Sequence, residues 1–387
     1  MNTFVLTSEQ EMLRDGLQRF LDNRYDLATS RAAVKTGGGW QPAIWRAMAE
    51  DLGLLGATLP ESAGGTGGGS TELMIIAEAL GRSLVVEPYV DTAVLGAGLL
   101  HRGGGPRARE VLEGIVAGTA LTAFAGAEGA GFEVVATTAR REHGGWVLHG
   151  AKPVVTTAPL ATHLLVTART GGSPEGVSLF LLDFDATDPP PRSTVHRLRT
   201  VDDRVAADLV FDGVRLPADA LLGTEGAAAP IVAAAVDDAT AAVCAEAVGC
   251  MRRVLADTVD YTRQRTQFGQ PISRFQVLQH RMVDMYLEVE QAAAATSLAM
   301  LSLDAPVPER TRAVSAAKAT ISRAARFVGQ NAVQLHGGMG MTEELAVGHY
   351  FKRLTAIEYE FGSTSSHLAR YASLTDPRAV TTSGGPP

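Results

Sequence analysis

Apolar residues near the start of the chain recur at the spacing of one helix face, and they comprise Leu13, Leu17, Phe20 and Leu21. Ser8 and Glu11 precede this repeat and form S-x-x-E, a pattern typical of a helix capping box. Further helical patterns run through residues 42–55 and 71–80. Residues 1–120 are therefore predicted to form a helical domain.

The pattern changes between residues 121 and 226, where short β-rich runs replace the helical repeats. Gly, Pro and Asp separate most of these runs at intervals of about 10–15 residues, with no clear helical period between them. The runs are 133–138, 146–149, 164–168, 177–182 and 207–211. We expect an antiparallel β domain over residues 121–226, either a small sandwich or a barrel.

Helical periodicity returns from residue 227, now over longer segments. One face carries Phe275, Leu278, Met282, Met285 and Val289, and a seven-residue repeat carries Val314, Ile321, Val328 and Leu335. Abundant alanine favours helix and close helix contact, so a bundle of long antiparallel helices is expected over residues 227–378. The polar, Gly/Pro-rich segment 379–387 is predicted to be a disordered tail. The chain is thus predicted to be an α+β multidomain protein.

Composition excludes several classes of protein. The net charge is −8, from 34 Lys and Arg against 42 Asp and Glu, which argues against a nucleic-acid-binding face built on bulk positive charge. The longest uncharged apolar run, near residues 226–236, is much shorter than the roughly 20 residues of a membrane span. The N-terminus has no signal-peptide pattern, so a cytoplasmic protein is expected. The only two cysteines, Cys244 and Cys250, point in different directions on a helix, and neither a disulfide nor a metal site is expected.

Residues 261–271, Y-T-R-Q-R-T-Q-F-G-Q-P, carry the first candidate binding chemistry. A helix ends here in a Gly/Pro loop that holds Arg263 and Arg265 beside Phe268. Arginine can pair with a phosphate through two parallel hydrogen bonds, and a phenyl ring can cover a flat ligand. The alternative is an ordinary helix C-terminus, at which the two arginines complement the helix dipole. Residue chemistry alone leaves both readings open.

Residues 334–344, Q-L-H-G-G-M-G-M-T-E-E, form the second candidate segment. A long helix runs into three glycines, Gly337, Gly338 and Gly340, whose backbone amides can approach a ligand closely because they lack side chains. The alternative is a glycine C-cap between two helices. A glycine cluster alone does not decide between a binding loop and a cap.

The two segments, in this order and on a helical–β–helical chain, resemble the acyl-CoA dehydrogenase family of flavoenzymes. The resemblance extends over nearly the whole chain and includes L-T-S-E-Q-E-M-L-R at 6–14, P-E-S-A-G-G at 60–65, L-H-G-A-K at 148–152 and V-F-D-G-V-R-L-P at 210–217. It implies a C-terminal four-helix bundle and an FAD site between the β domain and the bundle, completed by a neighbouring subunit. The implied reaction is α,β-dehydrogenation of an acyl-CoA thioester, and the implied electron acceptor is electron-transferring flavoprotein.

The resemblance also implies site residues. The cofactor contacts supplied to a neighbouring subunit would be Arg265, Gln267, Phe268 and Gln276, with Gln334, Gly337 and Gly338 at the pyrophosphate. Val154 and Thr156 match positions beside the isoalloxazine ring. No metal ligand is implied. The loop 125–131 departs from the T-E-P-x-A-G-S-D pattern of the family, which puts its flavin and substrate contacts in question.

The catalytic base is the main departure from the family pattern. Many members carry a glutamate directly before the glycine that corresponds to Gly362, and Phe361 stands there in this chain. Glu360 is one residue early, which in a helix turns it by about 100°. Other members carry the base on the first bundle helix, where Ala239 stands here beside Asp238. Glu360 and Asp238 are therefore the candidate bases within the chain.

These departures, together with G-H-Y-F-K-R-L-T at 348–355, resemble the base-lacking subunit of heteromeric bacterial acyl-CoA dehydrogenases. The resemblance implies a heterotetramer with a homologous subunit that supplies the base. It also implies a bulky substrate, such as a steroid side chain or a dicarboxylic acyl-CoA. Two alternatives stay open: a self-sufficient homo-oligomer with Glu360 or Asp238 as its base, and a non-catalytic scaffold subunit.

Overall fold

The computed structural model describes residues 6–35, 38–129, 132, 134–171 and 176–375. The predicted tail, 379–387, lies outside these residues. The chain forms two compact units, each built from segments distant in sequence. The bundle unit combines Met1–Gln18, Met74–Val85 and Thr240–Pro387, and the sheet unit combines Arg19–Leu73 and Val86–Ala239. The predicted domain boundaries stay predictions.

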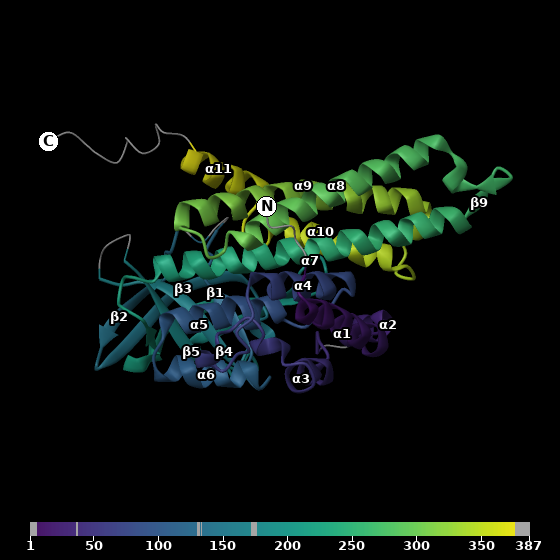
Figure 1. Cartoon of the computed structure of the whole chain (residues 1–387). Coiled ribbons are helices and arrows are strands. Elements are labelled where there is room, and N and C mark those ends of the chain that lie inside the picture. Colours follow the sequence, from purple (N-terminus) through teal and green to yellow (C-terminus); the bar gives the residue numbers. More distant parts are fainter. Residues whose placement is uncertain (1–5, 36–37, 130–131, 133, 172–175, 376–387) are drawn as a thin grey trace. The chain divides into compact units, whose positions relative to one another are not determined.

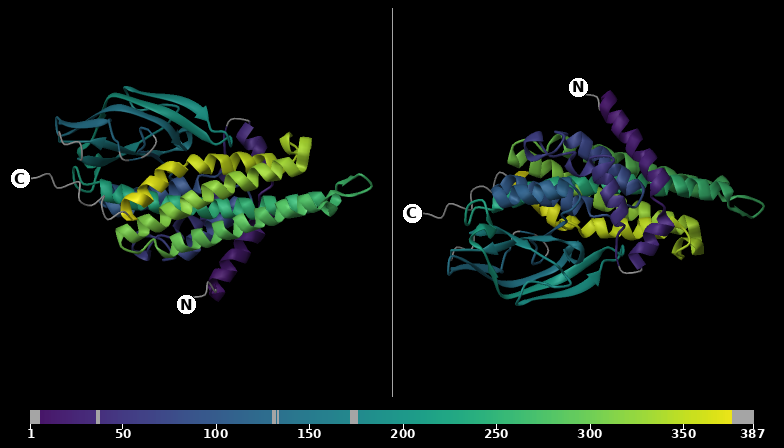
Figure 2. Two further views of the ribbon diagram at one scale, coloured as in Figure 1. Left: turned by 90° about the horizontal axis from the view of Figure 1, so that it is seen from above. Right: turned by 90° about the horizontal axis from the view of Figure 1, so that it is seen from below.

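Long helices form the bundle unit, as expected from the alanine-rich C-terminal pattern (Figure 1). They are α7 (Ala229–Gln264), which begins in the sheet unit, and α8 (Gln276–Leu301), α9 (Val307–His336), α10 (Ala346–Tyr359) and α11 (Thr364–Thr375). Helix α9 packs against α8, α10 and α11. Its seven-residue apolar repeat is buried as predicted, and so are Met285 and Val289 on α8. Figure 2 shows the hairpin of β9 (Thr266–Gln267) and β10 (Gln270–Pro271) projecting beyond the ends of α7 and α8.

Glycines allow α4 (Ser70–Arg82) to cross α7 at backbone contact. An added Cβ at Gly81 would lie 2.0 Å from the Glu246 carbonyl oxygen, and one at Gly249 would lie 2.0 Å from the Glu78 carbonyl oxygen. Both cysteines are buried and free, and the Cys250 thiol lies 3.2 Å from the Gly81 carbonyl oxygen. Any larger residue at either glycine would force the two helices apart.

The N-terminal capping box forms one residue earlier than predicted. Helix α1 spans Ser8–Arg24, and its cap is Thr7. The Thr7 amide donates to Gln10 Oε1 over 3.0 Å, and the Gln10 amide donates to Thr7 Oγ1 over 3.3 Å. The prediction of Ser8 with Glu11 was wrong because Thr7 and Gln10 match the same motif one position earlier.

Short helices and a mixed sheet form the sheet unit. The helices are α2 (Leu27–Lys35), α3 (Pro42–Glu50), the π-helix η3 (Val90–Gly96), α5 (Ala97–Gly103) and α6 (Pro106–Val116). Along the sheet the strand order is β6-β7-β3-β2-β4-β5-β8. Antiparallel pairs dominate, as expected, but β1 (Thr122–Ala125) pairs in parallel with β4 (His163–Arg169). The remaining strands are β2 (Thr138–Glu142), β3 (Gly145–Thr156), β5 (Val177–Asp183), β6 (Ser193–Arg199), β7 (Val205–Leu216) and β8 (Leu221–Leu222).

One predicted strand is displaced. The run 133–138 was expected to be β, but residues 134–137 are outside any strand and β2 begins at Thr138; Glu133 lies outside the described residues. The Glu128 carboxylate accepts hydrogen bonds from the Ala136 and Thr137 amides. These amides are therefore not available to a sheet ladder.

Neither a metal cluster nor a membrane-spanning helix occurs in the described part of the chain. No group of three or more His, Cys, Asp or Glu side chains among these residues has a metal-binding arrangement. No helix among them is both long enough and apolar enough to cross a bilayer.

Candidate functional site

Strand β3 ends in a strained segment in the sheet unit. The pairing of β3 with β7 shifts register between Lys152 and Val155. Val154 and Thr157 both adopt left-handed backbone, with φ of 48° and 66°, which is unusual for β-branched residues. The Val154 amide donates to Asp208 Oδ1 over 2.8 Å, which helps to hold this geometry. Such strain concentrates at functional sites, so the segment marks a candidate site independently of any motif.

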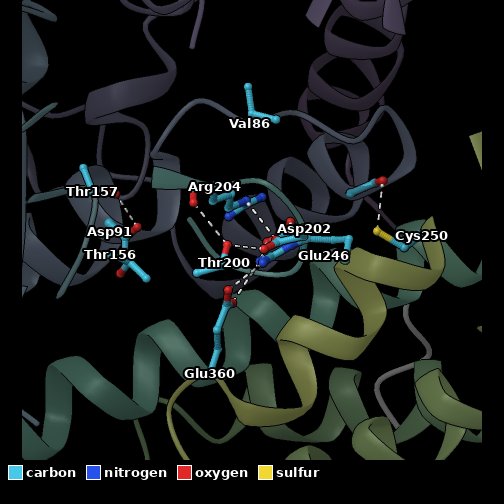
Figure 3. A network of polar contacts seen from close by, with 12 residues as sticks. Val86, Asp91, Thr156, Thr157, Thr200, Asp202, Arg204, Glu246, Cys250 and Glu360 are labelled. Atoms are coloured by element: carbon cyan, nitrogen blue, oxygen red, sulfur yellow. Dashed lines mark hydrogen bonds and ion pairs between the residues drawn. The ribbon is translucent and has the colours of Figure 1, made fainter. Parts of the chain in front are cut away.

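Asp91 on the π-helix η3 binds the end of this strained segment. Its carboxylate accepts hydrogen bonds from Thr156 Oγ1 over 3.0 Å and from Thr157 Oγ1 over 2.6 Å (Figure 3). A hydroxyl has one proton, and Thr156 donates it to Asp91. The Thr156 oxygen can therefore only accept a hydrogen bond from a further partner. The predicted flavin-facing Thr156 is therefore oriented by a residue 65 positions earlier in the chain.

A buried ion pair connects β3 to the loop after β1. The Lys152 side chain is fully buried, the Glu128 side chain is 8% exposed, and Lys152 Nζ lies 2.6 Å from Glu128 Oε1. Lys152 Nζ also donates to Thr167 Oγ1 over 3.0 Å. Burial opposes ionisation of Glu128, but the Lys152 ammonium and the Thr137 amide outweigh it, and the pKa of the Glu128 carboxyl lies below its ordinary value. This pair anchors the described part of the loop that departs from the family pattern, up to residue 129, to β3.

The first predicted binding segment is the hairpin that follows α7 in the bundle unit. Arg265, Gln267, Phe268 and the first α8 residue, Gln276, are all exposed. Phe268 is 90% exposed at the hairpin turn, with left-handed backbone. Its ring meets Phe275 edge-on at 6.0 Å between centroids. The hairpin therefore exposes an aromatic ring, Phe268, and a guanidinium group, Arg265, on the surface of the bundle unit.

The second predicted segment lies beside the end of α7. The Tyr261 ring stacks on His336 at 4.3 Å between centroids, and the Tyr261 hydroxyl donates to the His336 carbonyl oxygen. This contact brings the Arg265 segment and the glycine turn to the same end of the bundle unit. Gln334, Gly337 and Gly338 are exposed, and an added Cβ at either glycine would meet no atom within 4 Å. Gly340 differs, because an added Cβ there would lie 2.7 Å from the Val333 carbonyl oxygen, so packing explains that glycine.

Glu360, whose side chain is 21% exposed, pairs with a buried arginine. Arg353 on α10 contacts Glu360 at 2.5 Å and 2.9 Å and Glu246 on α7 at 2.7 Å and 2.9 Å. In Figure 3 the Glu246 and Glu360 carboxylates converge from two elements of the bundle unit. Both oxygens of the candidate base are thus bound to one guanidinium.

Backbone contacts hold the turn after Glu360. Buried Lys318 donates to the Gly362 carbonyl oxygen over 2.8 Å and to the Glu358 carbonyl oxygen over 3.1 Å. A ring nitrogen of His367 lies 2.9 Å from the Phe361 carbonyl oxygen, and Phe361 has left-handed backbone with φ of 56°. These contacts are made by backbone carbonyl groups, so they do not require a particular side chain at position 361.

Asp238, the other candidate base, is paired within the sheet unit. Arg102 Nη2 on α5 lies 2.7 Å from Asp238 Oδ2. Both candidate carboxylates are therefore paired with an arginine. Such pairing occurs in structural ion pairs as well as at catalytic bases.

Family models match almost the whole chain. The N-terminal, middle and C-terminal domain models of acyl-CoA dehydrogenases match residues 7–119, 120–214 and 230–373. The chain belongs to the acyl-CoA dehydrogenase family. It is therefore an FAD-dependent oxidoreductase that acts on acyl-CoA, as the motifs implied.

Named relatives and solved structures agree with this assignment. Acyl-CoA dehydrogenase FadE12 of Mycobacterium tuberculosis is 30% identical over 96% of this chain and 93% of its own length. The probable acyl-CoA dehydrogenase YngJ of Bacillus subtilis is 29% identical over 95% of this chain and 97% of its own. The ChsE4-ChsE5 complex of M. tuberculosis has a chain with a TM-score of 0.86 and 26% identity, covering 99% of this chain and 100% of that one. A variant of the Tcur3481-Tcur3483 steroid ACAD gives a TM-score of 0.86 and 28% identity, covering 96% and 99%. The predicted fold is confirmed.

The residues of this acyl-CoA dehydrogenase fit a dinucleotide cofactor. Gly337 and Gly338 expose backbone where a side chain would obstruct approach, and Arg265 lies at the same end of the bundle unit with no ion pair among the described residues. Guanidinium groups and exposed amides suit a pyrophosphate, and an exposed ring such as Phe268 suits a flat heterocycle. The individual cofactor contacts stay predictions.

Sequence reasoning missed the residues that support these groups. Asp91 carries no motif signal, because its partners lie on a distant strand. Lys152 lies in the L-H-G-A-K motif, but a lysine in a β-rich run is not expected to be buried, so its ion pair could not be predicted from the sequence. Arg353 stands in G-H-Y-F-K-R-L-T, where the pattern did not indicate its pairing with Glu246 and Glu360.

Proposed function

We propose that this acyl-CoA dehydrogenase builds its FAD site with a second, homologous subunit and takes its catalytic base from that subunit. The observation that carries the proposal is the turn after α10. Phe361 occupies the position of the family glutamate and has no group that accepts a proton, while Glu360 is bound through both oxygens to Arg353. To act as a base, Glu360 would first have to leave its ion pair with the buried Arg353 guanidinium.

Within this proposal the chain's own residues bind and orient the cofactor. Bound FAD supplies a hydride acceptor, which no amino-acid side chain provides. Arg265, Gln267, Phe268 and Gln276, with Gln334, Gly337 and Gly338, would hold the dinucleotide of the neighbouring subunit. Val154 and Thr156 would lie beside the isoalloxazine ring, and Asp91 would fix which way the Thr156 hydroxyl points.

The substrate class proposed is a bulky acyl-CoA, such as one carrying a steroid side chain. The support is the likeness to chains of the ChsE4-ChsE5 complex and of the Tcur3481-Tcur3483 steroid ACAD. A dicarboxylic acyl-CoA is the second member of this class. Electron-transferring flavoprotein is the proposed electron acceptor.

Co-purification tests the heteromer directly. The chain is expressed alone and with a homologous acyl-CoA dehydrogenase subunit encoded beside it, and FAD per chain and turnover of an acyl-CoA panel are measured. Full FAD content and turnover only in the co-expressed complex support the proposal. A lone chain that is yellow and fully active contradicts it, and flavin absent from both preparations favours a scaffold subunit.

Replacing the two candidate bases separates the heteromer from a self-sufficient enzyme. In the assembled enzyme, Glu360→Gln and Asp238→Asn are each expected to change kcat by less than about threefold, because the base comes from the partner. A true general base contributes about 10²–10⁴-fold. If either variant loses turnover on that scale while FAD remains bound and the melting temperature is unchanged, this chain supplies its own base.

Removing the exposed ring at the hairpin tests the cofactor surface. Phe268→Ala is expected to raise the dissociation constant of FAD about fivefold, since a stacked aromatic ring contributes on the order of 1 kcal/mol. Met341→Ala is the matched control, because Met341 is also exposed (80%) but is not a predicted contact. Equal FAD affinity in both variants, measured by flavin fluorescence titration, would contradict the role of the hairpin.

A further inference from the structure

A cavity of about 410 Å³ lies within the bundle unit among α1, α4, α7 and α8. Small-molecule sites span roughly 300–1,000 Å³, so its size suits a small ligand. Much of its lining is apolar and includes Met74, Ile75, Ala79, Val248 and Ala293. None of the predicted flavin contacts or candidate bases lines it.

The α4–α7 crossing explains why this space exists. Gly81 and Gly249 let the two helix backbones touch, which fixes the separation of α4 and α7. Alanines at 79, 245 and 293 then leave the space beside the crossing unfilled.

A buried hydroxyl in the cavity lining has no partner. Thr296 is 2% exposed, and its Oγ1 makes no hydrogen bond to any described residue. Other helical threonines in the chain, Thr258, Thr320 and Thr355, each donate to the carbonyl oxygen four residues earlier. Leaving a buried hydroxyl unsatisfied costs about 1–3 kcal/mol, which a ligand oxygen at this position would recover.

Three arginines line the cavity, and two of them pair with a carboxylate. Arg14 pairs with Asp15 at 2.9 Å, and Arg252 pairs with Glu78. Arg82, the third arginine in the lining, forms no ion pair within the described ranges of the chain. Its guanidinium suits an anionic group because it presents several donors and carries no acceptor.

We propose that this cavity binds an amphipathic monocarboxylate. The alkyl body lies along the apolar lining, and the carboxylate accepts hydrogen bonds from the Thr296 hydroxyl and the Arg82 guanidinium. The site is separate from the acyl-CoA reaction and does not rest on the proposed heteromer.

Titration calorimetry with sodium octanoate tests the site on the full-length, FAD-loaded protein, with 1-octanol as the uncharged comparison. We expect saturable binding of one octanoate per chain and none of 1-octanol. Arg82→Gln should weaken binding about tenfold, because it removes a charge-assisted hydrogen bond. Thr296→Val, which is nearly isosteric, should weaken it about three- to tenfold. Ala293→Leu adds three carbon atoms to the apolar lining and should weaken binding about tenfold or more by occupying part of the cavity.

Two comparisons make the result decisive. Arg312→Gln changes an exposed arginine of the bundle unit outside the cavity lining and should leave affinity unchanged. Circular dichroism and melting temperature confirm that each variant folds. The proposal is overturned if the wild type shows no saturable binding, or if Arg82→Gln and Thr296→Val bind as tightly as wild type. Undiminished binding by folded Ala293→Leu also overturns it, because octanoate would then occupy another site, such as the acyl pocket.

Discussion

Lys152→Met is expected to lower the free energy of unfolding by about 3–5 kcal/mol, the cost of removing one partner of a buried ion pair. The Lys152 side chain is fully buried and binds Glu128, Thr167 and the Gly126 carbonyl oxygen. Methionine has a similar length, so packing is largely kept while the Glu128 carboxylate loses its counter-charge. Urea unfolding followed by far-ultraviolet circular dichroism measures the difference.

Two further variants attribute that loss to the buried charge. Lys152→Met combined with Glu128→Gln should recover part of the stability, because no unpaired carboxylate remains. Arg141→Met breaks the exposed pair with Glu225 and removes the contact of the Arg141 guanidinium with the Trp146 ring, and it should cost less than about 2 kcal/mol. If Lys152→Met unfolds at the same urea concentration as Arg141→Met, the buried pair does not anchor the loop before β2.

Phe361→Glu is expected to raise the turnover of the lone chain, expressed per bound FAD, by about 10²-fold or more, by placing a carboxylate at the predicted family base position. The turn tolerates the change because its backbone is held through the carbonyl groups of Phe361, Gly362 and Glu358. The left-handed backbone already accommodates a side chain at position 361. Turnover is measured with the acyl-CoA that serves the assembled enzyme.

Phe361→Gln is the matched control, since it has nearly the same shape as the glutamate variant and does not act as a carboxylate base. Equal turnover in the two variants at equal FAD content would show that position 361 does not face the substrate. The heteromer proposal would then lose its main support, even if the lone chain stays inactive.

Local periodicity predicted much of the fold. The seven-residue repeat of α9 is buried because burial of one helix face depends mainly on spacing along the chain. The alanine-rich pattern of α7 and α8 likewise indicated long helices. The strand expected at 133–138 failed because a side chain, Glu128, took the amides that a ladder would have used. The local sequence pattern of residues 133–138 does not indicate that the Glu128 side chain competes for these amides.

By itself, the sequence determined the family, the order of helical and β regions and the FAD chemistry, and it predicted that Phe361 stands at the family base position. Each depends on residue identity and spacing along the chain. Only the tertiary structure decided that Asp91 orients Thr156, that Glu128 anchors Lys152, and that Glu360 is bound to an arginine shared with Glu246. Glu246 lies 107 residues before Arg353, and such a contact is set by how helices pack. Charge, burial and hydrogen-bond geometry are properties of that packing, and they decide whether a carboxylate is a base or a structural anion.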